Sequence, residues 1–169
     1  MIHIFDNVID EKLLEEYLTT IENHYNKMSV LNDRYRNPDG HVNFYPTRNV
    51  QLKPDNVIVD SIKNYLESKI KVKLTCYDVE LQTWPIDSWS KVHNHSTDSL
   101  RVTGDYNSLL YLNDGFLGGE FYTSNGIMIQ PKKNRLTFFN GNDIDHGVKP
   151  VMEKHRYTII FWWKNTKFY

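Results

Sequence analysis

Histidines in the second half of the chain have the side chain and the spacing needed to bind a metal. His93 and His95 are separated by one residue. On a β-strand such positions project to the same face, so both imidazoles can point into one cavity. Two imidazoles from one strand form half of a metal site, which a ligand from another strand can complete. The competing interpretation is a pair of exposed histidines at the end of a strand.

His146 and Arg156 are the other residues in this region that suggest chemistry. His146 follows the apolar residues 136–139, and Gly147 beside it permits a close approach of another backbone. Arg156 opens the apolar run RYTIIFWW, where a guanidinium at the start of a strand can be half-buried. A guanidinium in a dry cavity requires an anion, and its planar fork fits a carboxylate through two hydrogen bonds. Each residue taken alone is also compatible with a surface position.

Six sequence features follow one another in a fixed order between residues 79 and 163. Together they resemble the prolyl 4-hydroxylase-like branch of the iron(II) and 2-oxoglutarate-dependent oxygenases. The match in order and spacing is far more specific than any single feature. The features are Trp84-Pro85, His93-Asn94-His95, Leu110-Tyr111-Leu112-Asn113-Asp114, Gly118-Gly119-Glu120, His146 and Arg156.

The resemblance implies a role for each of these residues. His93 and His146 would bind iron(II), while Arg156 and Tyr111 would hold the distal carboxylate of 2-oxoglutarate. Trp84 occupies a cofactor-binding position that is often tyrosine in the family, so a hydroxyl contact from there would be missing. The implied activity is hydroxylation of a C–H bond with iron(II), 2-oxoglutarate and O2, with ascorbate as an accessory reductant. The metal centre itself supplies the catalysis.

One position departs from the family pattern. The carboxylate ligand expected two residues after the first histidine is replaced by His95. The site is therefore a three-histidine centre of His93, His95 and His146, or it recruits Asp98 as the alternative third ligand, or it binds metal poorly. Counting from the Y-L-N strand can also place His95 as the first ligand. A functional metal site is favoured, because the residues implied to bind 2-oxoglutarate, Tyr111 and Arg156, are both present.

The substrate and the rival functions are less constrained by the sequence. A peptide, protein or small-molecule substrate is expected beside the metal, with Trp89, Asp98 and Arg101 as candidate contacts. One rival is a three-histidine cupin-type dioxygenase that does not use 2-oxoglutarate, which the H-x-H favours and Arg156 opposes. Another is a metal-free jelly-roll binding module whose four tryptophans line a groove. Retention of a divalent metal by the protein separates the module from both enzymes.

The elements that position these residues change along the chain. The sequence predicts a mainly β protein with supporting N-terminal helices, and the resemblance implies a double-stranded β-helix of the jelly-roll, cupin-like kind. We expect one domain over residues 1–169, with helical cover in 1–70 and the jelly-roll core in 71–169. In this arrangement the helices would pack on the outside of the larger sheet.

Hydrophobic spacing predicts the individual elements. Asp10 is expected to cap a first helix, and a second helix is expected to begin at Pro54-Asp55. Alternation of apolar residues predicts extended segments from Val72 onward, with further strands at 91–95, 106–113, 119–123, 127–130, 135–140 and 156–163. The expected buried faces are Leu13, Leu14, Tyr17, Leu18, Ile21 and Tyr25 in the first helix, Val57, Ile58, Ile62, Tyr65 and Leu66 in the second, and Val72, Leu74, Cys76, Val79, Leu81 and Thr83 in the first extended segments.

Overall composition limits the classes of partner. A formal net charge of -1 offers no general attraction to nucleic acid or to an acidic membrane surface. The single cysteine, Cys76, excludes an internal disulfide and a cysteine-based metal site. The sequence shows neither a signal peptide at its start nor an apolar run of about 18 residues. A cytoplasmic location is the resulting expectation, and it suits ferrous iron.

Overall fold

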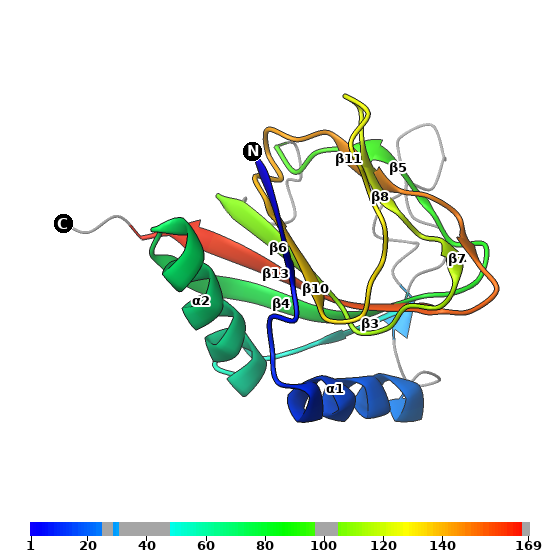
Figure 1. Cartoon of the computed structure of the whole chain (residues 1–169), viewed down its shortest axis with the longest axis horizontal. Helices are drawn as coiled ribbons and strands as arrows, with labels where there is room; N and C mark the ends of the chain where they lie inside the picture. Colours follow the sequence, from blue (N-terminus) through cyan, green and yellow to red (C-terminus); the bar gives the residue numbers. More distant parts are fainter. Residues whose placement is uncertain (25–28, 31–47, 97–104, 167–169) are drawn as a thin grey trace.

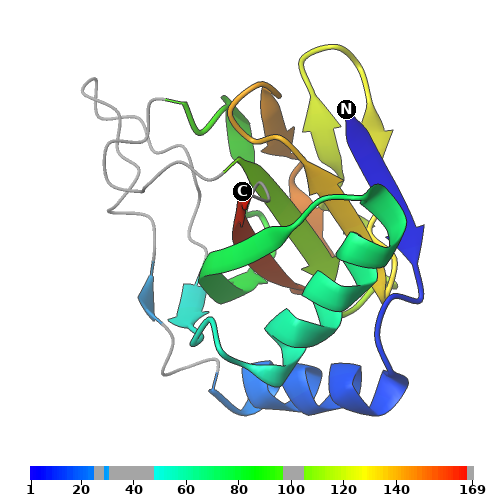
Figure 2. The same cartoon turned by 90° about the vertical axis from the view of Figure 1, so that its left-hand side faces the viewer.

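Antiparallel strand pairing organises the computed structural model, which describes residues 1–24, 29–30, 48–96 and 105–166. The strands form a seven-stranded sheet, a four-stranded sheet and a two-stranded ribbon. The smaller sheet lies opposite one face of the seven-stranded sheet, and both helices lie on the other face (Figures 1 and 2). This arrangement is the predicted jelly-roll with supporting helices, and the prediction of fold class is confirmed.

The seven-stranded sheet places the last strand at its centre and the first strand at its edge. Its order is β1 (Ile2–Asp6), β10 (Arg135–Phe139), β6 (Tyr106–Tyr111), β13 (Arg156–Asn165), β4 (Leu74–Trp84), β3 (Arg48–Gln51) and β2 (Ser29–Val30). The four-stranded sheet runs β5 (Ser90–His93), β11 (His146–Val148), β8 (Phe121–Thr123) and β9 (Met128–Ile129). The ribbon pairs β12 (Val151–Met152) with β7 (Leu117–Gly118). Segments far apart in sequence therefore meet in every layer.

Both predicted helices are present, with one correction at the start of the second. Helix α1 (Glu11–His24) begins where expected, since the Asp10 carboxylate accepts a hydrogen bond from the Lys12 amide at 2.9 Å. Helix α2 (Val57–Ile70) begins later than Pro54-Asp55, because the Asn56 side chain caps it by accepting from the Ile58 amide at 3.1 Å. The expected burial of Val57 is wrong.

Val57 is 59% exposed because it occupies the first turn of α2, on the face directed away from the sheet. Val59 is buried in its place, together with Ile58, Ile62 and Leu66. These residues follow one another at spacings of one, three and four, so they share one face of the helix. In α1 the expected Leu14 and Ile21 are fully buried, while Tyr25 lies outside the described residues.

The two predicted extended segments before residue 84 are one long strand with a bulge. In β4 the residue opposite Trp162 is Asp78 and the residue opposite Trp163 is Cys76, so Tyr77 is the extra residue. A bulge shifts the alternation of side chains by one position. Leu74 before the bulge and Val79 and Leu81 after it therefore contribute to the same core despite their different parity.

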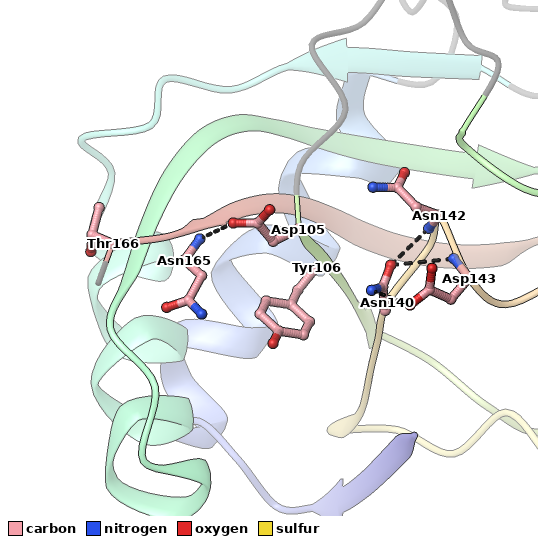
Figure 3. A pocket seen from close by; sticks show the side chains of 7 residues that line it. All are labelled: Asp105, Tyr106, Asn140, Asn142, Asp143, Asn165 and Thr166. Atoms are coloured by element: carbon pink, nitrogen blue, oxygen red, sulfur yellow. Dashed lines mark hydrogen bonds between the residues drawn. The ribbon is translucent and has the colours of Figure 1, made fainter. Parts of the chain in front are cut away.

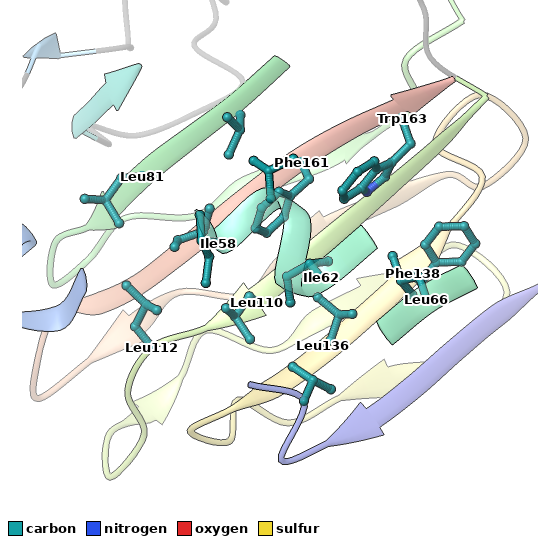
Figure 4. Packing of buried hydrophobic residues seen from close by; sticks show 14 of the residues in the cluster. Ile58, Ile62, Leu66, Leu81, Leu110, Leu112, Leu136, Phe138, Phe161 and Trp163 are labelled. Atoms are coloured by element: carbon teal, nitrogen blue, oxygen red, sulfur yellow. The ribbon is translucent and has the colours of Figure 1, made fainter. Parts of the chain in front are cut away.

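That core lies between the helices and the seven-stranded sheet. Figure 4 shows side chains of α2 packed over the neighbouring strands of the sheet. A second apolar cluster fills the space between the two sheets, with contributions from β6, β8, β9 and β10. The larger cluster includes Leu14, Ile21, Ile58, Ile62, Leu66, Leu81, Leu110, Leu136, Phe138, Phe161 and Trp163. The sheet is thus fixed from both faces, which gives its inner side chains a rigid base.

The first 70 residues contribute strands as well as the expected helical cover. Strand β1 forms one edge by pairing with β10, and β2 forms the other by pairing with β3, so both edges of the larger sheet come from this part of the chain. At the β1 edge, Arg135 donates two hydrogen bonds to the Asp6 carboxylate, at 2.7 and 3.1 Å.

Within the described residues, neither helix has the length and apolar character required to cross a lipid bilayer.

Candidate metal centre and anion pocket

Three histidines converge at one end of the smaller sheet. Antiparallel pairing of β5 with β11 places His93 directly opposite His146. Their ring centroids are 4.5 Å apart, and His95, just beyond the end of β5, lies 5.5 Å from His93 and 4.9 Å from His146. One ring nitrogen from each histidine lies within 4.8 Å of the other two. The predicted grouping of these side chains therefore exists in the folded chain.

Hydrogen bonds orient all three rings in the same sense. Nδ1 of His93 contacts the Lys91 carbonyl at 2.9 Å, and Nδ1 of His146 contacts the Ile144 carbonyl at 2.8 Å. Nδ1 of His95 contacts the amide oxygen of Asn107 at 3.0 Å. Because these oxygens only accept, each Nδ1 carries the proton and Nε2 is the nitrogen that can ligate a metal.

The environment of His146 favours its neutral form. The ring is buried between Phe121 and Phe139, whose ring centroids lie 5.2 and 4.8 Å away. Burial, reinforced by the neighbouring His93 and His95, holds the pKa of His146 well below its usual range, and the Ile144 carbonyl only partly opposes this. A neutral imidazole is the form that binds a divalent metal.

Beside the three histidines, the interior of the fold contains a charged side chain, Arg156, which is completely buried. Its guanidinium carbon lies 5.0 Å from the centroid of the Trp84 ring and 5.0 Å from that of the Tyr111 ring. Among the described residues, neither the three guanidinium nitrogens nor the Tyr111 hydroxyl has a hydrogen-bond partner. Burial lowers the pKa of Arg156, and the adjacent Tyr111 hydroxyl opposes this effect. Such a group can bind a carboxylate strongly.

Strand register explains this grouping. Arg156 at the start of β13 pairs with Trp84 at the end of β4, and Tyr111 at the end of β6 pairs with Thr158. Strand β13 lies between β4 and β6, so the two aromatic rings approach the guanidinium from opposite sides. The fold thus brings together Arg156, Tyr111 and Trp84, and their role in binding a co-substrate stays a prediction.

Close contacts explain why glycine occupies positions 118 and 119. Gly118 has φ +73°, and a Cβ there would lie 1.8 Å from the Pro150 carbonyl oxygen. Gly119 has φ +68°, and a Cβ there would lie 3.0 Å from Cδ of Arg156. Side chains at these positions would therefore separate the β7–β12 ribbon and press on the arginine.

A separate polar hollow opens near the histidines at the end of the larger sheet (Figure 3). Its volume is about 700 Å³. It contains none of the three histidines, although two of its lining residues flank Gly141, whose carbonyl contacts the His95 amide at 2.9 Å. The lining consists of Asp105, Tyr106, Asn140, Asn142, Asp143, Asn165 and Thr166. Its described lining residues include two carboxylates and no cationic side chain.

The remaining predicted site residues are placed only in part. Trp89 is half-buried directly before β5, and Asp98 and Arg101 lie outside the described residues. The sequence did not reveal a role for Asn107, which contacts His95. Its signal was an asparagine on the inner face of β6, in step with the apolar Leu109 and Tyr111.

The family comparison covers the strands that carry these groups. Residues 81–164, about half of the chain, match the family described as the 2OG-Fe(II) oxygenase superfamily. Prolyl 3-hydroxylase 2 of Homo sapiens and of Rattus norvegicus are each 38% identical to this chain over 65 residues. That alignment covers 34% of this chain and 9% of each relative, so the chain spans less than a tenth of their length.

Solved structures share the whole fold. A Pseudomonas putida prolyl-4-hydroxylase matches with a TM-score of 0.72 at 12% identity, covering 98% of this chain and 93% of that one. The viral collagen prolyl hydroxylase of Paramecium bursaria Chlorella virus-1, in a 2OG complex, matches with a TM-score of 0.69 at 16% identity, covering 98% and 96%.

A third structure is a Trichoplax adhaerens prolyl hydroxylase in complex with a hypoxia inducible factor peptide fragment, with a TM-score of 0.68 at 20% identity and coverage of 97% and 83%. At these identities the matches establish the fold, and the family match covers the strands that bear the histidines, Arg156, Tyr111 and Trp84. The chain belongs to the 2OG-Fe(II) oxygenase superfamily.

Proposed function

We propose that residues 1–169 act as one iron(II)- and 2-oxoglutarate-dependent oxygenase domain that hydroxylates a C–H bond. The observation that carries the proposal is the presence of two complementary sites inside one barrel. One is the set of three histidine rings, in each of which Nδ1 is engaged by an oxygen acceptor. The other is the buried guanidinium of Arg156, which has no acceptor among the described residues.

The residues present fit both groups that this activity requires. His93, His95 and His146 would hold the metal through Nε2, since each Nδ1 is engaged by an oxygen acceptor. Arg156 and the Tyr111 hydroxyl would bind the distal carboxylate of 2-oxoglutarate, because both are buried donors without another partner in the described part of the chain. Trp84 would cover the guanidinium without adding a hydroxyl contact.

A metal and 2-oxoglutarate bound here would supply the oxidation by O2, with one oxygen atom entering the substrate C–H bond and the other entering succinate, which forms with CO2 by oxidative decarboxylation of the 2-oxo acid. The chain supplies orientation and a dry interior. Arg156 fixes the far end of the co-substrate through charge-assisted hydrogen bonds. Phe121 and Phe139 pack against His146 and keep water away from that ligand. The protein groups thus set geometry while the cofactors carry the redox chemistry.

The structural neighbours support a peptide as the substrate that we propose, with a prolyl residue as the first candidate. Three solved structures with the same fold are prolyl hydroxylases, and one of them is bound to a peptide fragment. Trp89, which is half-buried directly before β5, would contact this peptide. Peptide hydroxylation is best tested with a library of proline-containing peptides and detection of a 16 Da mass gain.

The replacement of a carboxylate ligand by His95 favours one rival, a three-histidine dioxygenase that does not use 2-oxoglutarate. A dioxygenase of this kind would supply no carboxylate to bind the buried guanidinium of Arg156. A spectrum of the anaerobic protein with iron(II) and 2-oxoglutarate separates the two, because a 2-oxo acid chelated to iron(II) gives a visible charge-transfer band. The proposal expects this band and its loss in Arg156→Ala.

The other outcomes of this titration each support a different function. Iron binding without the band in the wild-type chain would replace our proposal by the three-histidine dioxygenase. Absence of both iron binding and the band would leave a binding module built on the same fold. A His146→Ala variant serves as the negative control, since it removes the most deeply buried of the three histidines.

A further inference from the structure

His95 differs from the other two histidines in how its position is fixed. His93 and His146 lie on paired strands, whereas His95 lies two residues beyond the end of β5. Its backbone amide donates to the Gly141 carbonyl in the loop between β10 and β11, at 2.9 Å. The ladder of the smaller sheet therefore does not determine where its ring points.

The ring of His95 is oriented from the larger sheet. Asn107 is 1% exposed on the inner face of β6, and its amide oxygen contacts Nδ1 of His95 at 3.0 Å. The amide nitrogen of Asn107 is buried and has no partner among the described residues. Within this part of the chain, the hydrogen bond to His95 is the one side-chain interaction of this buried amide.

Gly141 leaves the space in which this hydrogen bond forms. A Cβ at Gly141 would lie 2.0 Å from the amide oxygen of Asn107 and 2.5 Å from Nδ1 of His95. Asn140 holds the turn, since its side-chain oxygen accepts from the Asn142 amide at 2.9 Å. The loop thus presents both a backbone acceptor and an empty space to His95.

We propose that Asn107, backed by Gly141, is the positioning residue that makes His95 the third metal ligand. This inference rests on the proposed function. By accepting from Nδ1, Asn107 fixes the tautomer of His95 and directs Nε2 toward His93 and His146. Asn107 thereby supports the histidine that stands where the family carries a carboxylate, and it completes an electrically neutral ligand set.

The test is titration of the full chain with cobalt(II), followed by its visible absorption bands. Asn107→Leu removes the acceptor at similar volume and should weaken cobalt binding about 10- to 100-fold, the usual effect of losing such a supporting hydrogen bond. Asn107→Asp can only accept, so it should retain wild-type affinity within a few-fold and thereby check that Nδ1 of His95 is the donor. Gly141→Ala should behave like Asn107→Leu.

Ser108→Ala is the matched control on the same strand. Ser108 is buried on the opposite face of β6 and accepts a hydrogen bond from Trp163 at 2.8 Å, so its removal costs stability without touching the histidines. Cobalt affinity of this variant should equal that of the wild type. Circular dichroism establishes that each variant is folded before titration.

A double-mutant cycle distinguishes positioning from a general effect on folding. In a His95→Ala background, Asn107→Leu should change cobalt affinity less than twofold, because the group through which Asn107 acts is already gone. Equal weakening in both backgrounds, or wild-type affinity in Asn107→Leu, would overturn the inference while leaving the metal centre in place. A wild-type chain that binds no cobalt would instead overturn the proposed function.

Discussion

The side chain of Asn113 holds the backbone on both sides of Arg156. Its amide nitrogen donates to the His155 carbonyl at 2.8 Å, and its amide oxygen accepts from the Tyr157 amide at 2.8 Å. Asn113 lies two residues after the end of β6, so the segment that follows this strand is linked to the first residues of β13. The start of the strand that carries the guanidinium is therefore fixed from a neighbouring strand.

Asn113→Ala should loosen Arg156 without removing it. Loss of two hydrogen bonds at about 0.5–1.5 kcal/mol each predicts a decrease of about 1–3 kcal/mol in the free energy of unfolding. The dissociation constant for 2-oxoglutarate, measured calorimetrically with manganese(II) present, should rise severalfold. Asn113→Asp keeps the acceptor but loses the donor, so its dissociation constant for 2-oxoglutarate should lie between those of the wild type and Asn113→Ala. An unchanged constant in Asn113→Ala would show that Arg156 is held by its ring contacts alone.

Arg156→Met should separate binding from stability. Burial of a guanidinium without an acceptor is costly, so an apolar side chain of similar length should leave the free energy of unfolding of the ligand-free protein unchanged or higher. The wild-type protein should gain about 2.7 kcal/mol at 2-oxoglutarate concentrations 100 times its dissociation constant. Thermal unfolding with and without 2-oxoglutarate measures both effects. A ligand-induced shift in the variant would contradict the assigned role.

Gly118→Ala and Gly126→Ala form a matched pair. Both glycines have positive φ, +73° and +91°, but a Cβ meets the Pro150 carbonyl oxygen at 1.8 Å in the first and nothing within 4 Å in the second. Gly126→Ala should cost only the backbone strain, about 1–2 kcal/mol. Gly118→Ala should cost at least 2 kcal/mol more, or prevent folding, because strain and overlap add. Equal losses in urea unfolding would mean that the β7–β12 ribbon can move aside.

Acid should weaken the attachment of β1 to β10. Hydrogen bonds from Arg135 and Lys132 hold the pKa of Asp6 well below its usual range. The stability this pair contributes is fully present above the unfolded pKa of about 4, and it is lost as the pH falls through the lower folded pKa. Asp6→Asn should therefore cost about 1–2 kcal/mol at pH 7 and less at pH 2, which lies below the unfolded pKa, so that part of the stabilisation is already lost. Denaturant titrations at the two pH values measure the difference, and an equal cost at both would contradict this origin.

Local patterns predicted the fold class and several of its strands. Alternation identified the strands that carry Arg156 and Tyr111, because an inner face of a sheet follows a period of two over several residues. Strand β11 escaped prediction, since it spans only His146–Val148 and includes a glycine. The bulge at Tyr77 was not predicted either, because a change from even-numbered to odd-numbered apolar positions also fits two separate strands.

Contacts made over long sequence distances could not be predicted. The resemblance placed Asn113 in its motif but assigned it no partner, and Gly141 has no local signature that links it to His95. Likewise, Val57 and Val59 are both apolar, and only the cap at Asn56 decides which one faces the sheet. The sequence therefore pointed to side chains that the fold brings together, and their roles stay a prediction, whereas the residues that hold them in place required the tertiary structure.

The central position of β13 has a consequence for biosynthesis. This strand pairs with both β6 and β4, and its residues 156–165 are synthesised after both of these partners. Until they emerge, β4 and β6 lack the partner that joins them, and the apolar face that α2 covers cannot assemble on a complete sheet. Such a topology delays cooperative folding of this domain until β13 has been synthesised, and it leaves strand edges of β4 and β6 unpaired until then.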